Sequence, residues 1–168
     1  VAIPNGDPVV TLTPRQQRLV RWSDSSGMIP DPVAAVSPAA HPRVGAQVAF
    51  FDGTTNLVTV NAGGVWLRAR VTGFEVKPTG SGDSVSCPGS GVKATAGDTP
   101  SSLPNGCWYK YRTSSAAQVD QKYPALATTT WVAEYSSSPA GPWTRFNTFT
   151  KSQVTTIKVT EIQSLVVS

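Results

Sequence analysis

The stretch from residue 43 to residue 76, RVGAQVAFFDGTTNLVTVNAGGVWLRARVTGFEV, decides the fold class of this chain. Apolar side chains alternate with small or polar ones at its start, where the apolar positions are Val44, Ala46, Val48 and Phe50. Asp52-Gly53-Thr54 and Asn61-Ala62-Gly63-Gly64 then place turn residues between the apolar runs. Because a period of two puts successive side chains on opposite faces of a strand, the stretch predicts β-strands joined by turns.

The same pattern continues toward the C-terminal end of the sequence. We expect strands over residues 44–50, 57–60, 65–71, 74–76, 107–111, 126–135, 143–150 and 154–167. Short strands separated by turns that contain Gly and Pro are typical of β-sandwiches and β-barrels. The chain is therefore predicted to be all-β.

The first 42 residues have a different character. We expect an extended segment over residues 1–12 and then a short helix from Thr13 to about Trp22, since Thr can cap a helix and Pro14 suits its first position. Residues 23–42 contain four prolines and have the composition of a linker, or alternatively of an ordered edge strand. We predict an N-terminal arm over residues 1–42 and a β-sandwich over residues 43–168.

Two cysteines, Cys87 and Cys107, enclose a segment with four Gly and three Pro. A structural zinc site needs four ligands, whereas the chain offers only these cysteines and one histidine, at unsuitable spacings. We therefore expect a disulfide, which in the chain-entropy model stabilises the fold by about 3 kcal/mol. Disulfides persist in oxidising compartments, so the pair indicates a secreted, extracellular or cell-surface protein.

The composition favours a folded extracellular domain. Charged residues make up 14% of the chain, and the formal net charge of +4 is spread along it. Such a charge is compatible with acidic wall polymers as partners but does not point to nucleic acid. No apolar run approaches the roughly 18 residues of a membrane span. The sequence begins at Val1 and not at Met, so we expect a leader such as a signal peptide to have been removed.

Five segments in a fixed order carry a resemblance to a known family. They are Val44–Phe50, Gly73–Val76 followed by Gly82-Asp83, Cys107–Ala116, Thr128–Tyr135 and Val159–Val167. Together they resemble PKD-like, immunoglobulin-type domains, and more closely a group of secreted actinobacterial proteins built around such a domain. The compact Trp-x-Phe-Gly-Asp-Gly turn of the usual PKD pattern is replaced here by a longer segment, residues 74–83.

The resemblance covers about three quarters of the chain, residues 43–168. It implies an immunoglobulin/PKD-like β-sandwich preceded by the extended arm, and it implies export. PKD domains serve as adhesive, carbohydrate-associated or spacer modules. The resemblance therefore implies fold and export more strongly than an activity, and no cofactor is expected.

Residues that could carry catalysis are scarce. His41 is the one histidine of the chain, and it lies in the proline-rich segment with no nucleophile motif of the Gly-x-Ser-x-Gly type elsewhere. Glycoside hydrolysis would need a pair of carboxylates, and most of the ten acidic residues sit beside turn or capping residues. Glu134 and Glu161 lie on expected strands, but the sequence does not give their separation. We therefore expect that the protein is not an enzyme.

One turn could instead hold a cation. Asp52-Gly53-Thr54-Thr55-Asn56 offers oxygen atoms at a spacing that Ca²⁺ can use, but Asp-Gly is also an ordinary turn signal. Asp83 would join such a site only if the fold brings the two corners together. No metal site is predicted, and calcium at Asp52 stays an open alternative.

A basic and aromatic pattern occurs on two expected strands. The face opposite the apolar one carries Trp66, Arg68 and Arg70 on the first strand and Trp108, Lys110 and Arg112 on the second. If these strands share a sheet, the six residues form a surface that could bind glycans or other anionic polymers through charge and stacking. The alternative is that each Trp stacks on neighbouring Arg and Lys stems across an ordinary solvated sheet.

Both extremities of the chain are apolar, at Val1-Ala2-Ile3 and Leu165-Val166-Val167. Isolated β-domains usually protect such edges, so these ends are expected to pack on the sandwich itself or on neighbouring subunits. The function predicted is a non-enzymatic structural subunit of an extracellular or cell-surface assembly, which associates through its N-terminal arm and strand edges. The alternative is an adhesion module for cell-wall glycans or other anionic polymers.

Overall fold

The structure, a computed structural model, describes residues 28–62 and 64–161. This part of the chain is all-β, as predicted. Its strands are β1 (Ala34–Ser37), β2 (Gln47–Asp52), β3 (Leu57–Ala62), β4 (Val65–Lys77), β5 (Val85–Pro88), β6 (Cys107–Lys110), β7 (Tyr123–Ser136) and β8 (Thr144–Ile157), with a short 3₁₀ turn, η1, at Val119–Gln121. No helix long and apolar enough to cross a membrane occurs within these residues.

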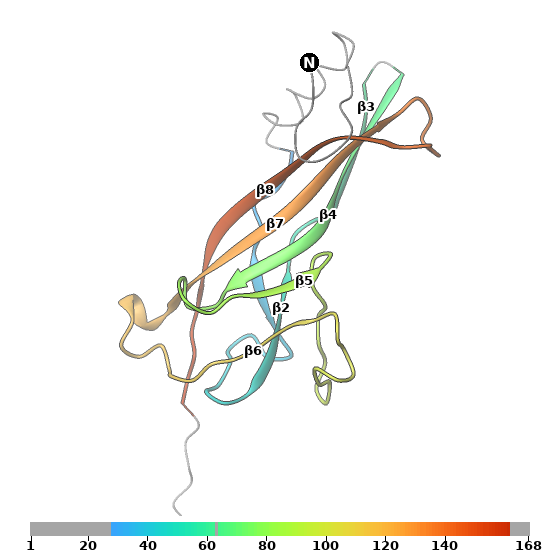
Figure 1. The fold of residues 1–168 in the computed structure, drawn as a ribbon. Coiled ribbons are helices and arrows are strands. Elements are labelled where there is room, and N and C mark those ends of the chain that lie inside the picture. The colour runs from blue at the N-terminus through green and yellow to red at the C-terminus, as the bar shows by residue number, and fades with distance from the viewer. Residues whose placement is uncertain (1–27, 63, 162–168) are drawn as a thin grey trace, which may run out of the picture.

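The strands form two antiparallel sheets (Figure 1). The small sheet has three strands in the order β1-β2-β6. The large sheet has five strands, with β3-β4-β7-β8 side by side and β5 paired to β4. Since β3 and β5 pair with the same edge of β4, each uses a different half of that strand, and a bulge at Thr72 separates the two halves.

The main core lies between the two sheets, which makes the fold a β-sandwich. Inward-facing side chains from the small sheet meet inward-facing side chains from β4, β5 and β7 and from the end of β8. The largest of them are Phe50, Phe74, Tyr111 and Tyr123. Tyr111 stacks on Tyr123 with ring centroids 5.3 Å apart, and its hydroxyl donates a hydrogen bond to the Pro78 carbonyl. The alternation read from the sequence therefore does place one face of each strand in the core.

The long strands β4, β7 and β8 continue past the small sheet toward β3 (Figure 1). On the inner face of this distal half, smaller apolar clusters replace the main core. Trp131 is completely buried there, stacks on Phe149 and packs with Ala69 and Ile29. Leu67, Ala133 and Phe146 form a neighbouring cluster.

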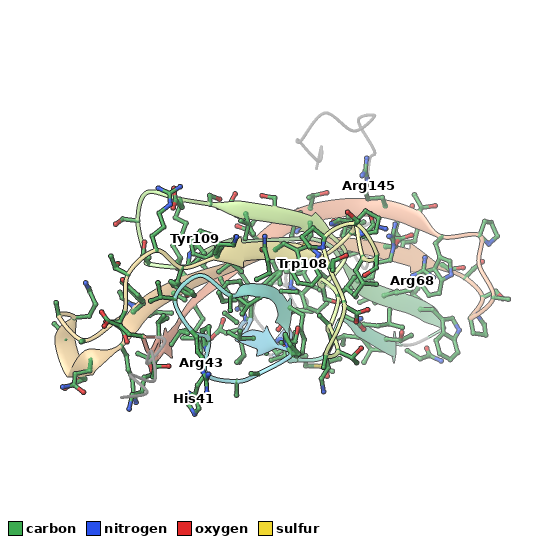
Figure 2. The ribbon with its side chains drawn as sticks, turned by 90° about the horizontal axis from the view of Figure 1, so that it is seen from below. His41, Arg43, Arg68, Trp108, Tyr109 and Arg145 are labelled. Atoms are coloured by element: carbon green, nitrogen blue, oxygen red, sulfur yellow. A yellow bond between two sulfur atoms is a disulfide. The ribbon has the colours of Figure 1, made fainter. Side chains whose placement is uncertain are left out.

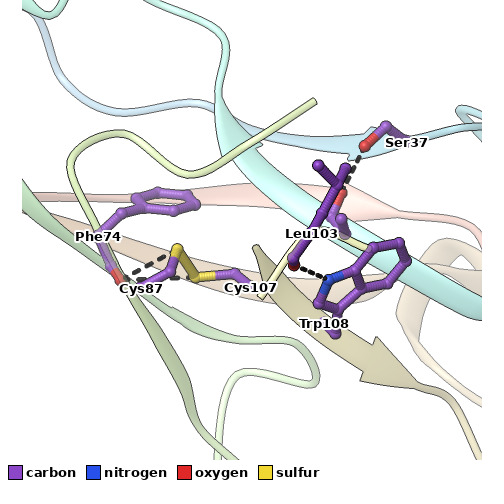
Figure 3. Close-up of a disulfide and its surroundings, with 7 residues drawn as sticks. Ser37, Phe74, Cys87, Leu103, Cys107 and Trp108 are labelled. Atoms are coloured by element: carbon purple, nitrogen blue, oxygen red, sulfur yellow. Dashed lines mark hydrogen bonds between the residues drawn. A yellow bond between two sulfur atoms is a disulfide. The ribbon is translucent and has the colours of Figure 1, made fainter. Parts of the chain in front are cut away.

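The predicted disulfide between Cys87 and Cys107 is confirmed, with Cα atoms 5.2 Å apart (Figure 3). It joins β5 of the large sheet to β6 of the small sheet, so it links the two layers. The segment that it closes folds back over the small sheet. The Ala94 amide donates to Ser37 Oγ at 2.9 Å, and Gly91 forms an isolated bridge with Phe51.

Two expectations about the strands need correction. The segments expected as separate final strands, 143–150 and 154–167, are joined in β8, which runs without a turn from Thr144 to Ile157. Lys151, Ser152 and Gln153 include no Gly, Pro, Asn or Asp, and each pairs in register with β7. In addition, the proline-rich segment is not only a linker: its alternative, an ordered edge strand, is observed at Ala34–Ser37 in the small sheet, so the sandwich begins before residue 43.

The expected helix over 13–22 and the apolar ends at 1–3 and 165–167 lie outside the described residues.

Candidate functional site

The residues of the predicted basic and aromatic face lie on different sheets. Trp66, Arg68 and Arg70 are on β4 of the large sheet, whereas Trp108 and Lys110 are on β6 of the small sheet, with Arg112 just beyond its end. Figure 2 shows Arg68 and Trp108 on separate strands. The condition for a shared surface, that the two strands belong to one sheet, is therefore not met.

Trp108 is used to hold the disulfide-closed loop (Figure 3). Its indole Nε1 donates a hydrogen bond of 2.8 Å to the Leu103 carbonyl. A Cβ at Gly106 would lie 2.7 Å from the same Nε1, so glycine is needed where the loop passes the ring. Lys110 and Arg112 are exposed. This half of the predicted face therefore combines an anchored Trp with solvated cations.

The β4 half is organised around an acidic residue, Glu134 of β7. Arg68 Nη2 donates to Glu134 Oε2 at 2.9 Å, and Arg70 Nε donates to Glu134 Oε1 at 2.5 Å. Alternation along β4 puts both arginines on its outer face, and the register places Glu134 directly opposite Arg68. The Glu134 side chain is only 8% exposed. Since a carboxylate so buried needs charge partners, the two guanidinium groups account for its position.

Trp143 completes this cluster from the turn before β8. The Arg68 guanidinium carbon lies 4.2 Å from the Trp143 ring centroid, which is a cation–π contact. A Cβ at Gly141 would lie 2.9 Å from Trp143 Cδ1, so the turn can bring the ring close only because residue 141 is glycine. We call Arg68, Arg70, Glu134, Trp66 and Trp143 the β4 cluster. A hollow of about 260 Å³ lies at the same end of the sheet, between Val65, Tyr135 and Pro142.

The sequence had indicated three members of the β4 cluster but not Glu134 or Trp143 as their partners. Glu134 was noticed only as an acid on a strand. A lone carboxylate in the Thr-rich, largely apolar run 126–135 was a usable signal, because such a group calls for a nearby cation. Trp143 had no comparable signal, since its position depends on the backbone of the preceding turn.

A tyrosine on the inner face of β6 is paired with an acid. The Tyr109 hydroxyl donates to Asp83 Oδ2 at 2.9 Å, and its ring meets Tyr111 edge-on. Burial, followed by the hydrogen bond to Asp83, raises the pKa of Tyr109 to about 12. Burial raises the pKa of Tyr111 in the same direction.

These raised pKa values predict a loss of stability in alkali. An unfolded tyrosine loses its proton near pH 10, whereas the folded Tyr109 keeps it until about 12. Between these values the unfolded state binds fewer protons, so the free energy of unfolding falls as the pH rises. Tyr109→Phe should lose less stability than the parent protein over this range. Urea midpoints measured from pH 8 upward test this, and parallel curves for the two proteins would contradict it.

Asp52 and Asp83 do not share a site. Asp52 Oδ1 accepts hydrogen bonds from the Val33 amide, the Thr54 amide and Thr54 Oγ1, as a turn-capping carboxylate does. Asp52 Oδ2 is buried and has no partner among the described residues. Asp83 is instead bonded to Tyr109. Within the described ranges, no group of three or more His, Cys, Asp or Glu side chains is placed to hold a metal ion.

The residues considered for catalysis are also apart. His41 is exposed beside the buried Pro42 (Figure 2). Glu134 is occupied by Arg68 and Arg70, and Glu161 lies beyond β8 at the end of the described chain. The arrangement therefore brings neither His41 nor Glu161 to the β4 cluster.

Comparisons of this chain with protein-family models, with characterised proteins and with solved structures found no match. The PKD-like resemblance accordingly stays a prediction from the sequence.

Proposed function

We propose that this protein is a non-enzymatic structural subunit of an extracellular assembly, and that copies associate through the edge of β8 over Thr150–Ile157. The observation that carries the proposal is the length and exposure of that edge. A strand edge presents unpaired N–H and C=O groups and is a template for another strand.

β8 is the longest edge strand of the described sheets. Its segment Thr150–Ile157 alone has eight residues, whereas the edge strands β1, β3 and β6 have four, six and four. Over Thr150–Ile157 it pairs with β7 on one side, and no described strand pairs with the other. Val154 in the middle of this segment is 53% exposed.

The composition of the edge supports pairing with a second copy. Natural edges are usually blunted by proline, bulges or several charges. From Thr148 to Ile157 the sequence TFTKSQVTTI has no proline and a single charged residue, Lys151, and the bulge of β8 lies before this segment. An antiparallel pairing centred on Gln153 would set Lys151 opposite Thr155 of the other copy. Like charges then do not face each other, so the edge is compatible with itself.

The disulfide and the resemblance support the rest of the proposal. A disulfide that links the two layers suits an oxidising, extracellular setting. The PKD-like, immunoglobulin-type character expected from the sequence suits a structural or adhesive module. The N-terminal arm, which was also expected to contribute to association, lies largely outside the described residues.

Adding charge to the edge tests the proposal. Ser152→Lys with Val154→Lys places two lysines on the outer face of β8, and the pairing centred on Gln153 sets position 152 of one copy opposite position 154 of the other. We expect the dissociation constant for self-association to rise about tenfold or more. Thr128→Lys with Thr130→Lys is the matched control, since it adds the same charge to the same face one strand further in.

Sedimentation velocity over a dilution series measures the effect. Folding of each variant is checked by circular dichroism. Equal weakening in both double variants would point to general charge repulsion, and a parent protein that stays monomeric at every concentration would rule out the proposal.

A further inference from the structure

We propose that the β4 cluster binds a carboxylated polysaccharide, and that Arg70 donates hydrogen bonds to the carboxylate of the sugar. This site is independent of the β8 edge. It differs from the six-residue surface expected from the sequence, because it excludes β6 and includes Glu134 and Trp143.

The guanidinium group of Arg70 is held in place by Glu134, and its two Nη groups, which form a fork, are available to a ligand. Its Nε is bonded to Glu134, and its Nη groups donate no hydrogen bond to any described residue. The side chain is 47% exposed, compared with 26% for Arg68. A guanidinium carries five N–H donors, so four remain for a ligand. Because Glu134 fixes the plane of the group, less conformational entropy is lost when a carboxylate binds in the two-pronged geometry.

Glu134 also sets the net charge of the site. The two arginines and one carboxylate of the cluster leave a single positive charge, and Arg145 of β8 lies opposite Glu134 in the register. Such a charge is too little for a nucleic acid, which proteins bind by neutralising many phosphates at once. It is suited to a polymer with one carboxylate per sugar.

The surroundings of Arg70 suit sugar rings. Trp66 lies on the same face of β4, and Trp143 packs against Arg68, so aromatic surface flanks the fork. Trp66 and Trp143 are both partly exposed. On the neighbouring β3, Thr59 and Asn61 are exposed and lie opposite Arg68 and Trp66 in the register. Aromatic faces for stacking together with neutral hydroxyl and amide groups provide the contacts that a sugar needs besides its charge.

Affinity electrophoresis in gels containing polygalacturonate tests the inference. Arg70→Gln should reduce retention about tenfold, which corresponds to the loss of a charge-assisted hydrogen-bonded pair. Arg70→Lys keeps the charge but loses the fork, and it should recover only a small part of that retention. Arg43→Gln, at an exposed position away from β4, is the matched control and should behave as the parent protein.

Other outcomes would overturn the inference. Full retention of Arg70→Lys would show attraction by charge alone. If Arg112→Gln lowers retention as much as Arg70→Gln does, the ligand binds the six-residue surface expected from the sequence and not the β4 cluster alone. Gels with neutral dextran and runs with a single-stranded oligonucleotide complete the test. If the protein binds either of these but not polygalacturonate, the proposed ligand class, a carboxylated polysaccharide, is wrong.

Discussion

Removal of the Cys87–Cys107 disulfide is expected to lower the free energy of unfolding by about 3 kcal/mol. The bond closes a loop with a sequence separation of 20, and in the chain-entropy model that loop restricts the unfolded chain. Both cysteines are buried, and their sulfur atoms lie close to the Phe74 carbonyl. Cys87→Ala with Cys107→Ala, compared with the parent protein in urea at neutral pH, measures the effect.

The loss should begin in the loop. Without the bond, the loop is held to the small sheet by contacts such as the Ala94–Ser37 hydrogen bond. A second contact is the hydrogen bond from Trp108 to the Leu103 carbonyl (Figure 3). Proteolysis of the double variant should therefore cut first between residues 88 and 106, before the sheets unfold. A cost below about 1 kcal/mol, or cleavage elsewhere first, would contradict a structural role for the disulfide.

Trp131→Ala is expected to lower the free energy of unfolding by about 3–5 kcal/mol, the usual cost of removing a buried aromatic side chain. Trp131 has no exposed surface, stacks on Phe149 and donates from Nε1 to Thr129 Oγ1. The substitution therefore leaves a cavity in the distal half of the large sheet. It also removes the donor to Thr129 Oγ1, which keeps its own hydrogen bond to the Lys151 carbonyl.

The control for this prediction is Trp66→Ala on the outer face of the same sheet. Trp66 is only partly buried, so its loss should cost much less than that of Trp131. Urea unfolding of both variants gives the comparison. Equal costs would mean that the inner face of the distal half is not packed as described.

The alternation of side chains was sufficient to predict most of the strands. β4 and β7 follow the expected runs closely, because Val, Leu and aromatic residues recur there with a period of two. The periodicity could not show that β8 is one strand, since Lys151-Ser152-Gln153 interrupts the apolar pattern and the pairing with β7 is what carries it through. β1 was expected only as an alternative to a linker, because four prolines surround it, and β5 was missed because it is short.

The candidate site was predictable only in part for a similar reason. Alternation alone puts Trp66, Arg68 and Arg70 on one face. Whether β6 joins that face depends on strand order, which is set by long-range packing and by the disulfide between the layers. The pairing of Arg68 with Glu134 depends on the register between β4 and β7, which local sequence does not specify.

Hydrogen exchange along β8 tests the central proposal, association through a free strand edge, most directly. Exchange of the Thr150–Ile157 amides is measured at low and high protein concentration, with the Tyr123–Ser136 amides of β7 as the internal reference. The proposal predicts that the Thr150–Ile157 amides that point away from β7 exchange at least about tenfold more slowly at high protein concentration. The exchange rates of the β7 amides should stay unchanged. If the particles grow with concentration and the β8 amides exchange at the same rate throughout, copies associate through another surface, and the proposed edge is wrong.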